Sequence, residues 1–291
     1  LCAPPPSSRL SVASSSYSFS RATRIVKEST IMDVVNKTAT DPTSASASTN
    51  TNNNAGSSES SKITCEMSSE EILTQLANHG CKNITSRLDF TKCHQTPVFT
   101  GGFGDVYMGY LKSGDLVALK CSRLRVDTSE KKKQLKRSAH ELYIWSKCRH
   151  SNILPLIGVA HYKDQLTMIS PWMAYGSLTA YLTQHPEADR YDMCAHIAEG
   201  VAYLHEQGIV HGDIKGANIM VSKEHVPKIA DFGTSVLRDY TLQFATTTKE
   251  QINTLRWAAP EVFKGITKLS TKGDVYSLGM VSSKAILRQA A

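Results

Sequence analysis

The sequence predicts an α+β fold in which a small strand-rich lobe precedes a helix-rich lobe. Short apolar runs separated by glycines fill residues 97–121, which is typical of an antiparallel sheet. Further on, Met193, Ile197, Val201 and Leu204 recur at the spacing of one helical face. Because strands come first along the chain and helices follow, we expect an α+β arrangement.

The elements are expected in a definite order. The stretch Ser-Ser-Glu-Glu at residues 68–71 marks the start of a short helix that ends near Gly80. A longer helix is expected over Ser129–Lys147, and another ends at Gly208. Strands are expected at Val98–Phe99, Asp105–Tyr110, Asp115–Cys121, Ile153–Tyr162 and Gln165–Ser170.

Three parts follow one another along the chain. Residues 1–61 are rich in Ser, Thr, Ala, Asn and Pro, so a disordered tail is expected, because little apolar surface offsets the entropy of ordering it. A transit peptide is the alternative for its first 27 residues, which contain Arg and Lys but no acid. Residues 62–96 are expected to be a linker with the short helix. The main domain then covers 97–291, with its β lobe at about 97–171 and its helical lobe at about 172–291.

Composition excludes several classes of protein. A chain of 291 residues with 41% hydrophobic residues buries a sizeable core, which excludes a disulfide-stapled miniprotein. No apolar run approaches the roughly 18 residues that cross a bilayer, so no membrane span is expected. The net charge of +7 suggests nucleic acid only weakly, because the one dense basic run, Lys131–Arg137, is typical of a solvated helix face; no nucleic-acid partner is expected. The seven scattered cysteines fit a reducing, cytoplasmic setting.

Two features of the β lobe suit phosphate chemistry. Glycines at residues 101–104 let backbone amides approach phosphate oxygens, although an ordinary hairpin turn has the same pattern. Lys120 lies in an otherwise apolar strand, where a charge needs an acidic partner or a phosphate. Glu141 in the next helix is a candidate partner, with a solvated helical glutamate as the plainer interpretation.

The helical lobe adds three further motifs. In the loop 211–218, Asp213, Lys215 and Asn218 suit a base, a phosphate-binding cation and a metal ligand. Asp-Phe-Gly follows at 231–233, and Ala-Pro-Glu at 259–261. Each motif alone occurs by chance, so only their common order along the chain is informative.

Together, in this order, the motifs resemble the signature set of eukaryotic protein kinases. The resemblance spans about residues 97–279, and finer details resemble the tyrosine-kinase-like group of Ser/Thr kinases, especially its fungal members. It implies a bilobal protein-kinase-like fold, with ATP and Mg²⁺ as cofactors. It also implies protein substrates with Ser or Thr acceptors and leaves room for a scaffold or signalling partner.

The resemblance assigns a role to each site residue. Asp213 would orient the substrate hydroxyl and accept its proton, and Lys215 would neutralise charge on the transferred phosphoryl group. Lys120 would pair with the α- and β-phosphates and with Glu141, and Thr254 fits the Ser/Thr pattern. The remaining site residues are the Mg²⁺ ligands Asn218 and Asp231 and, around ATP, Gly101, Gly104, Val106, Ala118, Lys120, Ser170 as gatekeeper, Trp172, Met173 and Met220.

Three features depart from the family pattern. Phe99 takes the place of the first glycine of the phosphate loop, which weakens or reshapes the cover over the nucleotide. Gly212 replaces an Arg that normally grips a phosphorylated loop, so phosphorylation at Thr246–Thr248 is not expected to be required. Twelve residues follow Gly279, so we expect a helical lobe that is truncated, with the apolar side of the helix around Val275–Val281 uncovered.

Two functions from different classes remain. The leading one is an ATP- and Mg²⁺-dependent Ser/Thr kinase, because every phosphoryl-transfer position is filled. The alternative is a pseudokinase or truncated nucleotide- or partner-binding module without turnover, which Phe99, Gly212 and the expected truncation of the helical lobe favour. Exchanging Lys120 for Met or Asp213 for Asn separates them, because only a kinase loses turnover.

Overall fold

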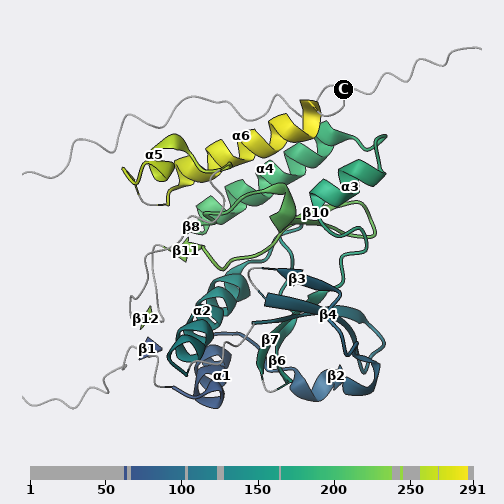
Figure 1. Cartoon of the computed structure of the whole chain (residues 1–291), viewed down its shortest axis with the longest axis vertical. Coiled ribbons are helices and arrows are strands. Elements are labelled where there is room, and N and C mark those ends of the chain that lie inside the picture. The colour runs from purple at the N-terminus through teal and green to yellow at the C-terminus, as the bar shows by residue number, and fades with distance from the viewer. Residues whose placement is uncertain are drawn as a thin grey trace, which may run out of the picture. The chain divides into compact units, whose positions relative to one another are not determined.

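An antiparallel sheet of six strands forms the first part of the fold (Figure 1). The computed structural model describes residues 62–63, 67–101, 104–122, 128–163, 165–237, 243–244, 256–267 and 269–287. The strand order is β2-β4-β5-β7-β6, with β3 paired to β4. The strands are β2 (Leu88–Asp89), β3 (Phe99–Gly101), β4 (Gly104–Leu111), β5 (Leu116–Cys121), β6 (Gly158–Tyr162) and β7 (Gln165–Pro171).

The register of this sheet gathers several predicted site residues on one face. Val106 lies opposite Lys120, and Ala118 lies opposite Ser170. Ala118 and Lys120 are two residues apart on β5, and residues opposite one another share a face, so all four side chains point to the same side. The other side is buried in an apolar cluster that includes Leu88, Leu111, Val117, Leu119 and Ile169.

Two helices accompany the sheet: α1 (Ser69–Asn78) and α2 (Thr128–Lys147). α1 begins where the sequence predicts, and its start is a capping box: the Glu71 amide donates to Ser68 Oγ at 3.2 Å, and the Ser68 amide donates to Glu71 Oε2 at 2.7 Å. Gly80 follows with φ +94°, a left-handed conformation that suits glycine and ends the helical segment.

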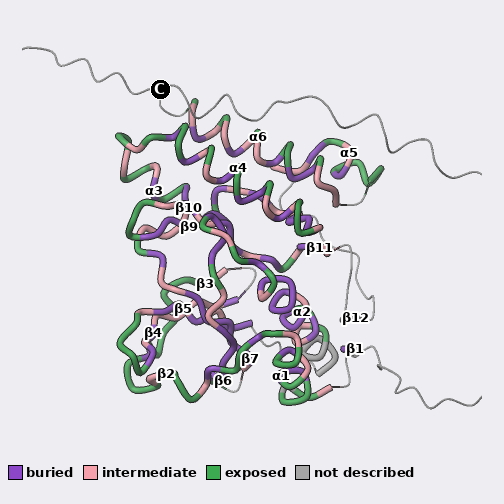
Figure 2. Tube along the Cα trace, turned by 180° about the vertical axis from the view of Figure 1, so that it is seen from behind, coloured by how far each residue is buried: buried purple, intermediate pink, exposed green. Residues whose placement is uncertain are grey.

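Helices dominate the second part of the fold. They are α3 (Leu178–Gln184), α4 (Arg190–Glu206), α5 (Pro260–Phe263) and α6 (Thr271–Leu287). α4 and α6 lie side by side in both views, and buried and exposed positions alternate along them (Figures 1 and 2). In the part of the chain that the structure describes, no helix is long and apolar enough to cross a membrane.

Short strands and turns complete the described residues. β8 (Ile209–Val210) pairs with β11 (Val236–Leu237), β9 (Ile219–Val221) pairs with β10 (Pro227–Ile229), and β1 (Lys62–Ile63) pairs with β12 (Gln243–Phe244). Single 3₁₀ turns occupy Thr85–Arg87, Phe90–Lys92 and Gly216–Asn218. The sheet-then-helix order is therefore the α+β arrangement that the sequence predicts.

The strand predicted over Ile153–Tyr162 is shorter in the structure and begins at Gly158. Before that point, the Leu154 amide donates to the Ile229 carbonyl of β10 at 2.8 Å, and only the Ile157 amide bonds to the sheet, at 2.9 Å from the Ile169 carbonyl of β7. The prediction failed there because apolar content alone does not say which partner a segment takes.

The segment 62–96 is integrated into the domain and is more than a linker with a short helix. Its strand β2 pairs with β4, and Ile84 and Leu88 are at most 2% exposed in the same cluster as the sheet. The apolar face of α1 joins the larger cluster, which extends to α2, α4 and Val281 of α6.

The helix around Val275–Val281 is only partly uncovered. Val275 is 57% exposed, as expected, whereas Val281 is 3% exposed, because that side of α6 belongs to the apolar cluster shared with α4. Tyr276 and Leu287 are also exposed on α6.

Candidate active site

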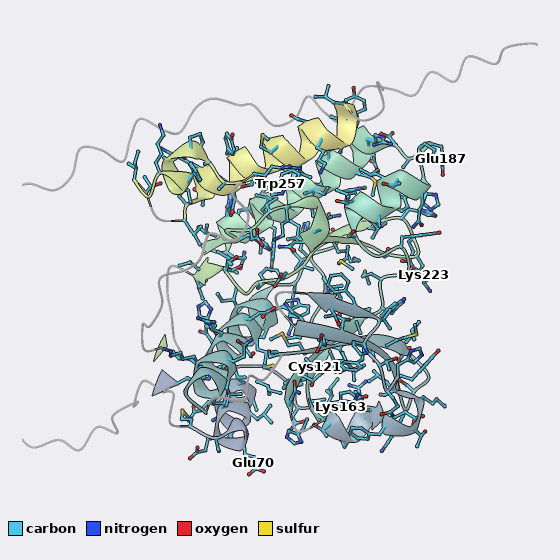
Figure 3. The ribbon with its side chains drawn as sticks, viewed as in Figure 1. Glu70, Cys121, Lys163, Glu187, Lys223 and Trp257 are labelled. Atoms are coloured by element: carbon cyan, nitrogen blue, oxygen red, sulfur yellow. The ribbon has the colours of Figure 1, made fainter. Side chains whose placement is uncertain are left out.

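Lys120 joins two acidic side chains from distant parts of the chain. Its Nζ lies 2.6 Å from Oε1 of Glu141 on α2 and 2.9 Å from Oδ1 of Asp231. Asp231 follows β10 in the chain. Cys121, which is labelled in Figure 3, follows Lys120 directly and is the last residue of β5. The Lys120 ammonium, which lies in an apolar strand and requires an acidic partner, therefore has two: Glu141 and Asp231.

Electrostatics favour the charged forms of Lys120 and Asp231 but not that of Glu141. Burial favours the neutral amine of Lys120, but the two carboxylates outweigh burial, and the pKa of Lys120 is raised. Burial also opposes ionisation of Asp231, yet the Lys120 ammonium outweighs it, and the pKa of Asp231 is lowered. For Glu141, burial raises the pKa, and the charge of Lys120 offsets this only in part.

The loop after β8 assembles a second polar group. Asp213 Oδ2 accepts hydrogen bonds from Lys215 Nζ at 2.6 Å and from Asn218 Nδ2 at 2.9 Å. Asn218 Nδ2 also donates to the Asp213 carbonyl at 3.0 Å. Because the amide nitrogen of Asn218 makes these bonds, its oxygen is the atom that can serve a cation.

The buried carboxylate of Asp274 on α6 positions the 211–218 loop. Asp274 on α6 is 1% exposed and accepts hydrogen bonds from the backbone amides of His211 and Gly212, each at 2.8 Å. His205 Nε2 lies 2.9 Å from the same carboxylate. Neither Asp274 nor His211 is among the predicted site residues; an acidic residue inside an apolar helical run was the signal for Asp274.

Asp231 itself is held in an uncommon backbone conformation. Its φ is +69°, in the left-handed region that non-glycine residues seldom adopt. The next residue, Phe232, is completely buried, with its ring 6.0 Å from that of Trp145 and 5.3 Å from that of His211. Packing of Phe232 against α2 and the 211–218 loop therefore fixes the direction of the Asp231 carboxylate.

The glycine-rich hairpin is formed by β3 and β4. Gly101 pairs with Gly104, and residues 102 and 103 lie outside the described residues. Gly104 has φ +133°, and a Cβ there would collide with the Cys121 carbonyl, so only glycine fits. Phe99 lies in β3 opposite Val106, as the sequence allows, and is 64% exposed.

The residues predicted around adenine come from both parts of the fold. Ser170 is 5% exposed at the end of β7, Met173 is 8% exposed, and the Trp172 amide donates to the Leu116 carbonyl at 3.2 Å. Met220 on β9 forms a bridge to Ser177, the residue before α3. Thr254 and Thr246–Thr248 lie outside the described residues.

Comparison with known proteins identifies this arrangement. The family model described as protein kinase domain matches residues 94–290. The chain belongs to the protein kinase domain family. The kinase domain is 37% identical over 194 residues to the L-type lectin-domain containing receptor kinase IX.1 of Arabidopsis thaliana, a match that covers 64% of this chain and 29% of that protein.

Other relatives of the kinase domain include the serine/threonine-protein kinase STY46 of Arabidopsis thaliana, at 31% identity over 63% of this chain and 31% of that protein. The MAP3K epsilon protein kinase 1 of Brassica napus is 33% identical over 62% of this chain and 14% of that protein. The chain thus spans less than a third of the length of these curated relatives.

The donor set of the kinase domain fits a magnesium nucleotide. Mg²⁺ takes oxygen ligands, and Asp231 and Asn218 provide a carboxylate and an amide oxygen. Lys120 carries a full charge beside them, and Gly104 keeps the backbone open at the hairpin. These residues are therefore chemically suited to a nucleotide phosphate chain and its cation.

Proposed function

We propose that this chain is a Ser/Thr protein kinase domain that transfers the γ-phosphoryl group of ATP to protein hydroxyls in the presence of Mg²⁺. The observation that carries the proposal is the Lys120–Glu141 contact at 2.6 Å with Asp231 on the same ammonium. This contact joins the sheet, α2 and the segment after β10. It therefore holds the Lys120 ammonium next to Asp231, the proposed metal ligand.

Asp213 is the group that acts on the acceptor hydroxyl. Its carboxylate already accepts two hydrogen bonds, from Lys215 and Asn218, which fix its orientation. A hydroxyl that donates to Asp213 would be turned toward the phosphoryl group and would lose its proton to the carboxylate. Lys215 would neutralise charge that develops on the equatorial oxygens, which is the main demand of phosphoryl transfer.

The nucleotide site is built from the remaining residues. Asn218 and Asp231 would hold Mg²⁺, which when bound neutralises charge on the phosphates. Lys120 would bind the α- and β-phosphates beneath the β3–β4 hairpin that carries Gly101 and Gly104. Adenine would lie among Val106, Ala118, Ser170, Trp172, Met173 and Met220.

The choice of Ser and Thr acceptors is a finer part of the proposal. It is supported by Lys215 two residues after Asp213 and by one relative, STY46, whose name describes a Ser/Thr kinase. Membership of the tyrosine-kinase-like group, and of its fungal members, stays a prediction, as does a role in signalling.

The test is phosphoryl transfer by the purified 291-residue chain with MgATP and a mixed protein substrate. Asp213→Asn and Lys120→Met should each lower turnover by about 100-fold or more, because each removes a group that acts on the reacting atoms. Exposed residues of the same types supply matched controls, Asp192→Asn and Lys112→Met, which should stay within about twofold of the parent.

The pseudokinase alternative is favoured by the exposed Phe99 at the hairpin and by Gly212 in the 211–218 loop. It predicts that ADP with Mg²⁺ raises the melting temperature of a folded chain that transfers no phosphate. Transfer that survives Asp213→Asn would refute the kinase proposal, and labelling confined to tyrosine would refute its Ser/Thr part.

A further inference from the structure

The segment that precedes the sheet contacts three parts of the kinase domain at once. We call residues 62–63 and 67–84 the N-terminal brace. It contains β1, α1 and the turn after α1, and it lies outside the region matched by the family model, which begins at residue 94. Figures 1 and 2 both place α1 and β1 beside α2 and β12.

The first contact is between α1 and α2. Ile72 and Leu76 of α1 are at most 1% exposed and share an apolar cluster with Tyr143 of α2. At the end of α1, the His79 ring lies edge-on to the Tyr143 ring at 5.8 Å, and Lys147 Nζ donates to the His79 carbonyl at 3.0 Å. The contact therefore combines apolar burial with a polar anchor.

The geometry of α2 makes this contact relevant to the site. Successive residues of an α-helix are about 100° apart, so Glu141 and Tyr143 are roughly 200° apart around α2. One side of the helix thus presents Tyr143 to α1, while the other presents Glu141 to Lys120 at 2.6 Å. α2 is held between the brace and the catalytic lysine.

The second contact ties the brace to the sheet. The Val159 amide of β6 donates to the Lys82 carbonyl, and the Ile84 amide donates to the Val159 carbonyl, both at 2.8 Å. A Cβ on Gly158 would lie 2.5 Å from the Lys82 carbonyl oxygen, so glycine is what allows this close approach. The brace cannot slide along α2 without breaking these bonds.

The third contact reaches the segment between the Asp-Phe-Gly and Ala-Pro-Glu motifs. β1 and β12 pair in parallel, with Lys62 opposite Gln243 and Ile63 opposite Phe244. β12 lies between Asp231 and Ala259 in the chain, so the pairing joins the brace to the segment that leads from the metal ligand toward α5.

We propose that the N-terminal brace is a positioning element of the kinase site, which holds α2 so that Glu141 stays within reach of Lys120. The inference rests on the proposed function. Without the brace, α2 loses its support on the side of Tyr143, although Trp145 still packs on Phe232, and the fraction of molecules with the Lys120–Glu141 contact falls. Activity then depends on a segment outside the matched family region.

Leu76→Asp tests the proposal by placing a charge in the contact with α2. The matched control is Ala77→Asp, which adds the same charge to an exposed position of the same helix. We expect Leu76→Asp to lower kcat at saturating ATP by about tenfold or more, and the control to stay within about twofold. Leu76→Met, which conserves the volume and apolar character of the side chain, should have the same kcat as the parent.

Hydrogen exchange provides a readout that does not require turnover. In Leu76→Asp the amides of residues 137–147 should exchange faster, while those of β4, β5 and β7 keep the parental rates. Unchanged α2 exchange, or an equal loss of kcat in Ala77→Asp, would overturn the proposal. If Leu76→Asp does not fold, Leu76→Ala is measured in its place, with the same criteria.

The same two readouts separate this proposal from the proposed function. A parent chain that folds but transfers no phosphate, and whose α2 exchange still rises in Leu76→Asp, contradicts the kinase function and supports the brace. A parent chain that is active, with activity and exchange unaffected by Leu76→Asp, contradicts the brace alone.

Discussion

The Asp274 carboxylate on α6 accepts a hydrogen bond of 2.8 Å from the backbone amide of His211. It accepts a second bond from Gly212 at the same distance, so one buried side chain fixes the start of the loop that carries Asp213. The two hydrogen bonds hold the carboxylate and the two backbone amides in place relative to one another. The position of Asp213 is therefore set by a residue 61 positions away in the chain.

Asp274→Ala should lower both stability and turnover. The two amides that lose their acceptor lie in a buried region, and each unsatisfied donor costs about 1–3 kcal/mol. We expect a lower melting temperature and a kcat reduced by more than about tenfold. Glu206→Gln, at an exposed position of α4, is the control and should match the parent; equal kcat in Asp274→Ala would show that the loop holds its place without this carboxylate.

Gly212→Ala should destabilise the fold. Gly212 has φ +79°, and a Cβ there would lie 2.7 Å from Leu269 Cδ1 and 3.3 Å from the Thr234 carbonyl oxygen. The left-handed backbone alone costs an alanine roughly 1–2 kcal/mol, which corresponds to about 2–4 °C in Tm at this chain length. Gly279→Ala in α6 has open space around its Cβ and should be neutral or stabilising. A Tm for Gly212→Ala at or above that of the parent would contradict the argument.

Stability should fall as the pH drops from about 7 to 4, in part through His140. Burial, helped by the nearby charge of Lys136, lowers the pKa of His140 in the folded chain to about 4, against 6.5 for the free side chain. The unfolded chain therefore takes up the proton at higher pH than the folded chain, so protonation favours unfolding. The contribution lost across this window is at most about 3 kcal/mol.

Urea unfolding at pH 7, 6, 5 and 4 measures this dependence. His140→Gln should show a shallower decline than the parent, whereas His161→Gln, at an exposed position of β6, should follow the parental decline. Identical slopes for the parent and His140→Gln would place the acid sensitivity elsewhere in the molecule.

Ser170 should decide how large a purine the site accepts. Its small side chain is 5% exposed at the end of β7, opposite Ala118. We expect the parent to accept an ATP analogue with a bulky group on the adenine amine, and Ser170→Phe to lower competition by that analogue about tenfold or more through steric conflict. Ser170→Ala should behave as the parent. Equal competition in the phenylalanine variant would mean that the group does not enter next to Ser170.

Local patterns in the sequence are enough to predict much of the fold and site. The helix start at Ser68, the strand around residue 120 and the Lys120–Glu141 contact are confirmed, because each has a short-range sequence signature or follows from the need of a buried charge for a partner. The β1–β12 pair and the Asp274 bonds were not predicted. Both join residues more than 60 positions apart, and no local periodicity records such contacts.

The pairing of Lys62 with Gln243 also bears on how the chain folds. The two strands are about 180 residues apart, so their meeting closes a very long loop for two residues of parallel ladder on each side. A contact that closes a long loop and gains few hydrogen bonds forms late, after contacts between nearer residues have shortened the loop that remains to be closed. The sheet and the α4–α6 pair should therefore become protected from hydrogen exchange early in refolding, and the pair of strands that closes the chain on itself should be the last to gain protection.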